Sequence, residues 1–169
     1  SVAIRQGMLV AHNIFGHPHP YNGTQATSAL KLYDYALATT GLTLTHALKR
    51  GIDAASVTFD GTWRPDYMPS TDKLAIVLVY DKKNRRVLGA QLLSKHDITQ
   101  SANAVSLAIQ NNNTIDDLAF VDMLFQPNFD YPFNYLNQVA QLAVDQEAAA
   151  GRTKPRFTAP GYENPDQKA

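Results

Sequence analysis

Cysteine is absent from the 169-residue chain. Its absence excludes disulfides, zinc sites built from thiolates and a cysteine nucleophile within this sequence. A surplus of one charge is also missing, because fifteen basic side chains balance fifteen acidic ones. Proteins that bind nucleic acid or anionic membranes usually carry a basic surplus, so the sequence predicts neither partner. Long apolar runs are missing too: Leu74 to Tyr80 is far shorter than the ~20 residues that span a bilayer.

A signal peptide is not recognisable either, since residues 1–14 carry Arg5 and lack a continuous apolar core. We therefore expect a cytoplasmic protein. With 44% hydrophobic and 18% charged residues, the composition is that of a globular domain rather than a disordered chain. A domain of this length buries roughly two-thirds of its unfolded surface, so it can fold without a disulfide or a metal.

The first third of the chain alternates between predicted elements and turns. Residues 1–14 place apolar side chains at helical spacing with no capping residue before them, which predicts a helix whose start is cut away. The proline- and glycine-containing stretch 15–23 predicts a linker. Residues 28–40 are rich in strand formers and predict a strand. Thr43 is suited to cap a short helix that ends at Gly51.

Three consecutive strands are predicted over residues 55–63, 74–80 and 86–94. Apolar residues occupy both alternating sets of the middle strand, so we expect both of its faces to be buried. The polar residues between the last two strands indicate a hairpin, with Asn84 expected in a left-handed turn position.

Helices are predicted after the strands. Asp97 with Gln100 resembles a capping box for a helix that reaches about residue 110, and Thr114 with Asp117 repeats the pattern before residues 115–125. A last helix is expected to start with Pro132 near its first turn. One face of that helix carries Leu136, Val139, Ala140, Ala143 and Val144.

Strands grouped together and followed by helices indicate an α+β fold, in which an antiparallel meander sheet has helices packed on one face. The segment after Gly151 shows little periodicity, and we expect residues 151–169 to be a mobile tail.

No catalytic or metal-binding set is assembled by the sequence. Neither G-x-G-x-x-G nor H-E-x-x-H occurs. His17 and His19 could ligate a metal, but a four-ligand site needs two more partners, so an exposed turn is the favoured interpretation. His46 and His96 lie beside predicted element ends, where a solvated or capping role is ordinary. The acidic pair 116–117 is better explained by a helix dipole than by acid/base catalysis.

Aromatic side chains concentrate between Phe120 and Tyr135. About half of them can be assigned to the core. The turn-like sequence QPNFDYP interrupts the helical period, however, so Phe129, Tyr131 and Phe133 cannot all point inward. Exposed aromatic residues on a proline-framed segment indicate a contact surface for another subunit or a ligand.

Two further residues extend this candidate surface. Asn134 adds an amide donor and acceptor beside the aromatic segment. Tyr67 is a second aromatic residue on a rigid turn, because it lies in the loop between Pro65 and Pro69.

Three stretches resemble one known family. GTQATSALKLYDYALATTG, at Gly23 to Gly41, resembles the first strand of the C-terminal dimerisation domain in the pyridine nucleotide-disulfide oxidoreductase family. That family includes NADH oxidases, NADH peroxidases and coenzyme A disulfide reductases. The hairpin LAIVLVYDKKNRRVLGAQLLS is similar to a strand pair of the same domain. MLFQPNFDYPFNYLNQVAQLA resembles the end segment of water-forming NADH oxidases.

The resemblance covers about residues 1–147 and implies a domain organisation. Residues 1–15 would be a remnant of the last helix of an FAD domain, and 16–24 a linker. The dimerisation domain would span 25–150, followed by the tail 151–169. FAD and NAD domains of the same parent chain would precede it, and the present chain alone would bind no cofactor or metal and show no activity.

The resemblance also implies a function. The parent would be a homodimeric, flavin-dependent NADH oxidase that uses FAD and NADH and reduces oxygen. By motif position Phe129 and Phe133, with Asn134 nearby, would lie close to the partner subunit's flavin site. Disulfide reductases carry tyrosines in two such places. Tyr67 resembles the first, but Phe129 occupies the second and has no phenol to donate a proton, which favours an oxidase.

Other functions stay open at this point. The chain could be the same domain of a coenzyme A disulfide reductase or an NADH peroxidase, or a free-standing α+β module that binds a partner through its aromatic segment. An independent hydrolase is least favoured because no nucleophile, base and orienting group come together. Whether the parent forms water or peroxide is not decided by these residues.

Overall fold

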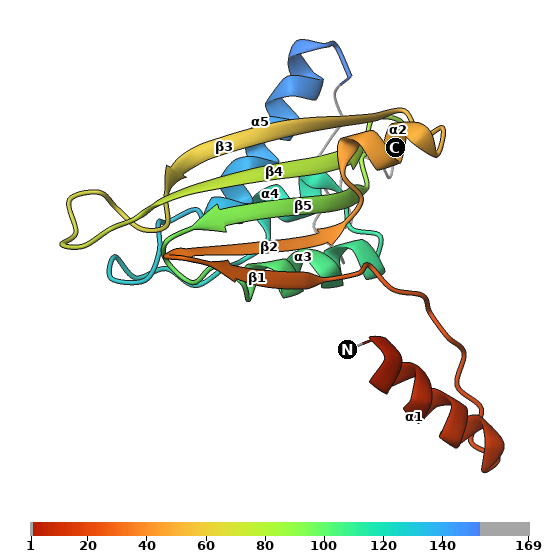
Figure 1. Cartoon of the computed structure of the whole chain (residues 1–169). Coiled ribbons are helices and arrows are strands. Elements are labelled where there is room, and N and C mark those ends of the chain that lie inside the picture. The colour runs from red at the N-terminus through yellow and green to blue at the C-terminus, as the bar shows by residue number, and fades with distance from the viewer. Residues whose placement is uncertain (1, 153–169) are drawn as a thin grey trace, which may run out of the picture.

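A computed structural model describes residues 2–152 of the chain. Its centre is a five-stranded, fully antiparallel sheet in the order β1-β2-β5-β4-β3 (Figure 1). The strands are β1 (Ser28–Leu32), β2 (Tyr35–Gly41), β3 (Ala54–Thr62), β4 (Lys73–Asp81) and β5 (Val87–Ser94).

Three helices, α3 (Ser101–Gln110), α4 (Ile115–Phe120) and α5 (Tyr135–Ala149), pack on one face of this sheet (Figure 1). Short helix α2 (Leu44–Lys49) connects β2 to β3, and α1 (Val2–Ile14) stands apart. The predicted α+β class, with helices on one sheet face, is confirmed.

The core lies between the sheet and the helices. Ile76, Leu78 and Tyr80 of β4 are fully buried there against residues of α3 and α5. On the opposite face only the end of β4 is covered, because Val79 packs in a smaller cluster with Ala47 of α2. On that face Ala75, Val77 and Asp81 are half-buried and Lys73 is exposed. The prediction that both faces of this strand are buried is therefore correct for one face and for one end of the other.

Helix α1 confirms the helix predicted over residues 1–14, but none of its residues is buried. Its apolar side chains Ile4, Met8, Val10 and Ile14 are exposed, and the helix lies clear of the sheet in Figure 1. Residues 15–27 connect it to β1 without regular structure. No helix within residues 2–152 has the length and apolar character needed to cross a membrane.

The single strand predicted over residues 28–40 is instead the hairpin β1–β2. The chain reverses at Tyr33 and Asp34, with Tyr33 in the left-handed region at φ 51°. Lys31 supports the turn by donating from Nζ to the backbone oxygen of Asp34 at 3.2 Å. Strand formers continue on both sides of the turn, which contains no glycine or proline, so local sequence did not mark the reversal.

In the β4–β5 hairpin, the left-handed position predicted for Asn84 is taken by Arg85, at φ 64°. The carboxylate of Asp81 accepts hydrogen bonds from the Lys83 amide and the Asn84 side chain, and the left-handed residue comes one position later than expected. Arg85 compensates for its strained backbone with a bidentate ion pair to Asp116, at 2.6 and 2.9 Å.

Two predicted helix starts are correct. Thr43 caps α2 by accepting from the His46 amide, and Thr114 forms a reciprocal capping box with Asp117 at the start of α4. Helix α4 is shorter than predicted and ends at Phe120, because Val121 adopts an extended backbone.

The other two predicted starts are wrong. Asp97 bonds the amide and hydroxyl of Thr99 instead of capping a helix, and Gln100 precedes α3 without a side-chain cap. Pro132 lies outside α5, whose cap is Asn134, two residues later. The predicted buried face of α5 is confirmed, with Val144 half-buried. The expected mobile tail falls almost wholly outside the described residues.

An ionic cluster ties α5 to the sheet at the Asp81 end of β4, and we call it the far-end network. It is built around Glu147, which is fully buried. Tyr80 donates from its hydroxyl to Glu147 at 2.8 Å, and Arg152 pairs with Glu147 at 2.5 and 3.0 Å. Arg85 joins the network by donating to the Arg152 backbone oxygen at 3.0 Å. The Arg152 guanidinium lowers the pKa of Glu147, whereas burial raises that of Tyr80 to about 12.

Candidate functional site

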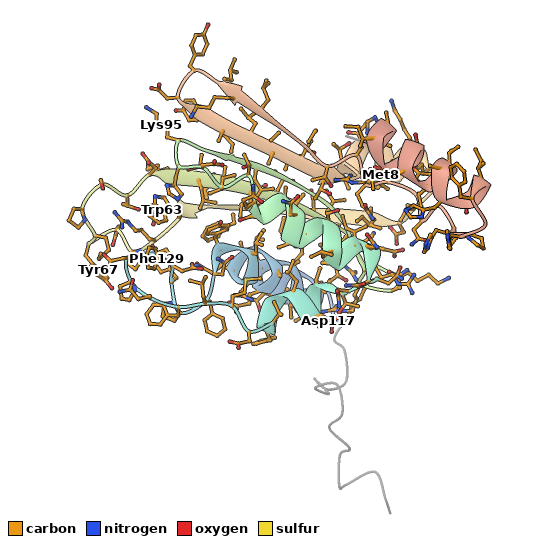
Figure 2. The ribbon with its side chains drawn as sticks, turned by 90° about the horizontal axis from the view of Figure 1, so that it is seen from below. Met8, Trp63, Tyr67, Lys95, Asp117 and Phe129 are labelled. Carbon is orange, nitrogen blue, oxygen red and sulfur yellow. The ribbon has the colours of Figure 1, made fainter. Side chains whose placement is uncertain are left out.

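Two loops meet at the other end of β4, where residue Lys73 begins the strand. They are the β3–β4 loop, residues 63–72, and the α4–α5 loop, residues 121–134, which we together call the aromatic end. Figure 2 shows Trp63, Tyr67 and Phe129 gathered at this end of the molecule. The loops are distant in sequence, and the sheet and helix α5 bring them together.

The predicted aromatic residues of this end differ in exposure: three are exposed to solvent and one is half-buried. Tyr67 is 74% exposed and Phe129 is 67% exposed, and Phe133 is also exposed. Tyr131 is half-buried and forms a 2.6 Å hydrogen bond between its hydroxyl and that of Thr62 on β3. As expected from the interrupted helical period, Phe129, Tyr131 and Phe133 do not all point inward.

Asn134 is engaged within its own loop. Its Oδ1 accepts from the Leu136 amide at 2.8 Å and caps α5, while its backbone amide donates to the Asn137 side chain at 3.0 Å. Its Nδ2 donates to the carboxylate of Asp130. The amide is therefore used to fix the loop against the helix, and its position beside Phe133 follows from that role.

Asp130 lies at the centre of the α4–α5 loop and is only 3% exposed. It accepts from the Tyr131 amide at 2.7 Å as well as from Asn134. Burial raises the pKa of Asp130, because the charged carboxylate loses solvation and has no cation among its hydrogen-bond partners. A buried carboxyl held by two donors is a rigid anchor for the exposed phenylalanines on either side.

Further contacts fix the same loop to α4 and α5. Asn137 donates from Nδ2 to the backbone oxygens of Leu118 and Val121, at 2.9 and 3.1 Å, which satisfies the open end of α4. Gln138 donates to the backbone oxygen of Phe133 at 2.9 Å. The exposed aromatic side chains are thus presented on a braced backbone.

A stacked ring pair lies beside the loops and was missed by the sequence interpretation. Trp63, at the end of β3, stacks on His96 with ring centroids 3.7 Å apart and planes 5° apart. Arg64 lies over the Trp63 ring at 4.4 Å. His96 had been assigned an ordinary solvated or capping role, and its real partner lies 33 positions away. The chain's single tryptophan, next to a proline-framed loop, was the available signal.

A pocket of about 530 Å³ opens between the stacked rings and the α4–α5 loop. Its polar groups include Asp130 and the hydroxyls of Ser101 and Tyr135, which share a 2.5 Å hydrogen bond. Burial raises the pKa of Tyr135. Its apolar wall is formed by Ala104, Met123, Leu124, Phe129 and Leu136.

The groups gathered at this end are aromatic rings, one buried carboxyl, hydroxyls and amides. No nucleophile and base are paired in it, and within residues 2–152 no group of three or more histidine or acidic side chains could hold a metal. The rings of His17 and His19 each contact the ring of His12, and the backbone of His19 is hydrogen-bonded to the Asn13 side chain. Asp116 pairs with Arg85, and Asp117 belongs to the capping box, so neither is a catalytic acid pair.

An apolar surface on the helix layer adjoins the aromatic end. We call it the helix-layer patch; it consists of exposed side chains of α3, α4 and the start of the α4–α5 loop: Leu107, Phe120, Val121, Leu124 and Phe125. A groove of about 460 Å³ between α3 and α4 runs through it and shares Ala104 and Met123 with the pocket at the aromatic end. The two hollows therefore form one continuous surface.

Residues 27–134 match the family model described as the dimerisation domain of pyridine nucleotide-disulphide oxidoreductases. An NADH oxidase of Enterococcus faecalis is 48% identical over 143 residues, which are 85% of this chain and 32% of the relative. An NADH oxidase of Streptococcus pneumoniae is 38% identical, over 85% of this chain and 32% of the relative. This chain thus spans about a third of the length of these curated relatives.

Solved structures agree with these matches. A water-forming NADH oxidase from Lactobacillus brevis, bound to NADH, superposes with a TM-score of 0.86 at 51% identity, over 88% of this chain and 33% of the other. An NAD-dependent persulfide reductase from A. fulgidus gives a TM-score of 0.81 at 26% identity, over 86% and 27%. The chain therefore shares its fold with the matching part of these two oxidoreductases, which is a third of one chain and about a quarter of the other.

Proposed function

The chain belongs to the pyridine nucleotide-disulphide oxidoreductase dimerisation-domain family, and on that premise we propose that it builds the homodimer of a flavin-dependent NADH oxidase. The resemblance that the motifs indicated is confirmed at the level of the family. In the proposed parent, FAD accepts hydride from NADH and passes the electrons to oxygen. The part played by this chain is to join two subunits and to cover the partner's flavin.

The observation that carries the proposal is the continuous surface formed by the helix-layer patch and the aromatic end. Exposed apolar side chains gathered on one face usually mark a contact with another protein. In a symmetric dimer the same patch is used by both subunits, so an apolar, groove-bearing face can be covered by its own copy. The aromatic end then lies at the rim of the interface, where it reaches the partner.

We propose distinct roles for the five candidate residues that the sequence indicates at the aromatic end. Tyr67, Phe129 and Phe133 are exposed and meet the partner's flavin site, where their rings exclude water and offer flat apolar faces. Tyr131 and Asn134 use their polar groups in hydrogen bonds within the chain, and these bonds keep the exposed rings in place.

This chain is suited to covering the flavin of the partner subunit and not to binding FAD itself. No dinucleotide-binding glycine motif occurs in the sequence, and the polar groups of the pocket are one buried carboxyl, hydroxyls, amides and the His96 imidazole, which is stacked on Trp63. A carboxylate disfavours a pyrophosphate, whereas ring faces and amides suit the flat part of a flavin. FAD and NADH would accordingly be bound by other domains of the parent, and the present chain alone would be inactive.

The identity of residue 129 favours an oxidase over a disulfide reductase. Phe129 has no phenol, so of the two positions at which disulfide reductases carry tyrosines only that of Tyr67 keeps a phenol here. A coenzyme A disulfide reductase remains the second candidate because of Tyr67. No feature of the aromatic end favours an NADH peroxidase, whereas a free-standing binding module would use the same exposed aromatic residues.

Helix α1 fits the domain organisation that we propose. Residues 1–15 form part of an FAD domain, 16–24 connect it to the dimerisation domain over 25–150, and α1 packs against the FAD domain through its apolar stripe. The support is that none of its residues is buried against the sheet or the other helices.

The dimer can be tested with a matched pair of leucines. Leu107 in the helix-layer patch and Leu30 on β1 are each 60% exposed. Leu107→Lys places a charge in the proposed interface and should weaken dimerisation at least about tenfold, while Leu30→Lys leaves it unchanged. Sedimentation equilibrium of the 169-residue chain measures both dissociation constants. Equal constants for the two variants and the wild type, or a wild-type chain that stays monomeric at high concentration, would overturn the proposed dimer.

A further inference from the structure

Arg64 is bonded to both loops of the aromatic end. Its Nη1 donates to the backbone oxygen of Asn128 in the α4–α5 loop at 2.9 Å. Its Nη2 donates to the backbone oxygen of Pro69, and to the Ser70 hydroxyl at 3.3 Å, within its own β3–β4 loop. One guanidinium thus joins the loop that carries Tyr67 to the loop that carries Phe129.

The surroundings of Arg64 provide no counter-ion. None of the ion pairs found within residues 2–152 includes it, and its Nε is buried without a hydrogen-bond partner. The charge is balanced by backbone oxygens and by the Trp63 ring, which itself stacks on His96. A partly buried cation without a carboxylate contributes little to folding, so stability alone does not account for an arginine here.

Arg85 shows what an arginine does when its role is structural. It makes a bidentate bond to Asp116 and belongs to the far-end network. Arg64 instead uses the two ends of its fork on two different loops. A lysine could keep the charge, but one ammonium on a flexible stem cannot hold both loops at a fixed separation.

We propose that Arg64 is a positioning residue that sets the separation of Tyr67 and Phe129 at the partner's flavin site. The guanidinium holds the two loops at one distance, and the Trp63–His96 stack holds the guanidinium. The role toward the flavin rests on the function proposed above, whereas the joining of the two loops rests only on the contacts of Arg64.

The joining of the loops is tested by amide hydrogen exchange in the 169-residue chain. Two reporter amides are available: Met68 donates to the Pro65 oxygen at 3.0 Å, and Phe129 donates to the Gln126 oxygen at 2.7 Å. Arg64→Lys should speed exchange at both amides roughly tenfold, with the amides of β4 unchanged. Arg64→Gln, which keeps a donor on only one side, is the second variant. Faster exchange at one reporter alone, or at neither, overturns the joining role.

The positioning role is tested in the full-length protein loaded with FAD. Arg64→Lys should change the flavin fluorescence and lower kcat at an unchanged melting temperature, with the KM for NADH unaltered, and Phe129→Ala should do the same. Arg85→Lys is the matched control, and should lower the melting temperature while the flavin signals stay as in the wild type.

The outcomes separate the two proposals. If both reporters exchange faster in Arg64→Lys, yet its flavin signals match the wild type while Phe129→Ala alters them, the positioning role is overturned and the proposed function stands. If Phe129→Ala and Tyr67→Phe also leave the flavin signals and kcat unchanged, the proposed function fails and the role of Arg64 toward the flavin fails with it. The exchange result then still decides whether Arg64 joins the loops.

Discussion

The two ends of strand β4 are built in opposite ways. In the far-end network, a fully buried Glu147 has its charge balanced by Arg152 and a hydrogen bond from Tyr80. At the aromatic end, large rings are exposed and Arg64 has no counter-ion among the described residues. The charges of the first end are paired within the chain, whereas the exposed rings of the second are available for contact with another molecule. If the proposed function holds, stability and function are located at different ends of one sheet, and substitutions can separate them.

The largest expected effect on folding is at the far end. Glu147→Ala removes a buried carboxylate and leaves the Tyr80 hydroxyl without its acceptor, so we expect a loss of about 2 kcal/mol in the free energy of unfolding. This loss is smaller than for an ion pair whose two side chains are both buried, because Arg152 is half-exposed and can be hydrated when Glu147 is removed. Urea unfolding measures it. A change below about 0.5 kcal/mol would place this cluster among surface ion pairs of little consequence.

Acid titration should distinguish the two ends by sign. The pKa of Glu147 is lowered in the fold, so its stabilisation is present above the unfolded pKa and is lost as pH falls through the folded one. The pKa of Asp130 is raised, so the folded state holds that proton more tightly. Its contribution is most favourable in acid and declines as pH rises past the unfolded pKa towards the folded one.

The titration compares wild type with Glu147→Gln and with Asp130→Asn. Over roughly pH 3 to 6 the difference in free energy of unfolding between the wild type and Glu147→Gln should rise with pH. The corresponding difference between the wild type and Asp130→Asn should fall with pH over the same range. Urea unfolding across this range measures both, and slopes of the same sign would contradict the contrast between the ends.

The smallest expected effect on folding comes from removal of a whole aromatic ring. Phe129→Ala should change the free energy of unfolding of the isolated chain by less than about 0.5 kcal/mol, because the ring is 67% exposed. Thermal and urea unfolding of the monomeric chain, kept dilute, provide the measurement. A loss of 2 kcal/mol or more would show that Phe129 is a core residue and that the aromatic end is completed within the chain.

Features that depend on neighbouring residues could be predicted from the sequence. Thr43 and Thr114 cap helices through amides three positions away, and the alternation in β4 follows from its side-chain spacing. The motifs around Phe129 and Phe133 indicated the family, and hence the fold. The exposure of these rings followed from the broken helical period, whereas their role at a flavin stays a prediction.

Features that depend on distant residues could not be predicted. The Trp63–His96 stack and the bond from Arg64 to Asn128 join segments that only the folded sheet brings together. The same holds for Glu147, whose partner Tyr80 lies 67 positions away. The hairpin turn at Tyr33 was missed for another reason, since it contains no glycine or proline.

The central claim is that the aromatic end of one subunit covers the flavin of its partner. Indole rings quench flavin fluorescence at close range, so Phe129→Trp in the full-length protein makes this contact measurable. We predict that the flavin of the Phe129→Trp dimer is less fluorescent than that of the wild type, and that its fluorescence recovers when Leu107→Lys is added and the dimer dissociates. Equal fluorescence of the Phe129→Trp and wild-type dimers, or quenching that persists in the monomer, would contradict the claim.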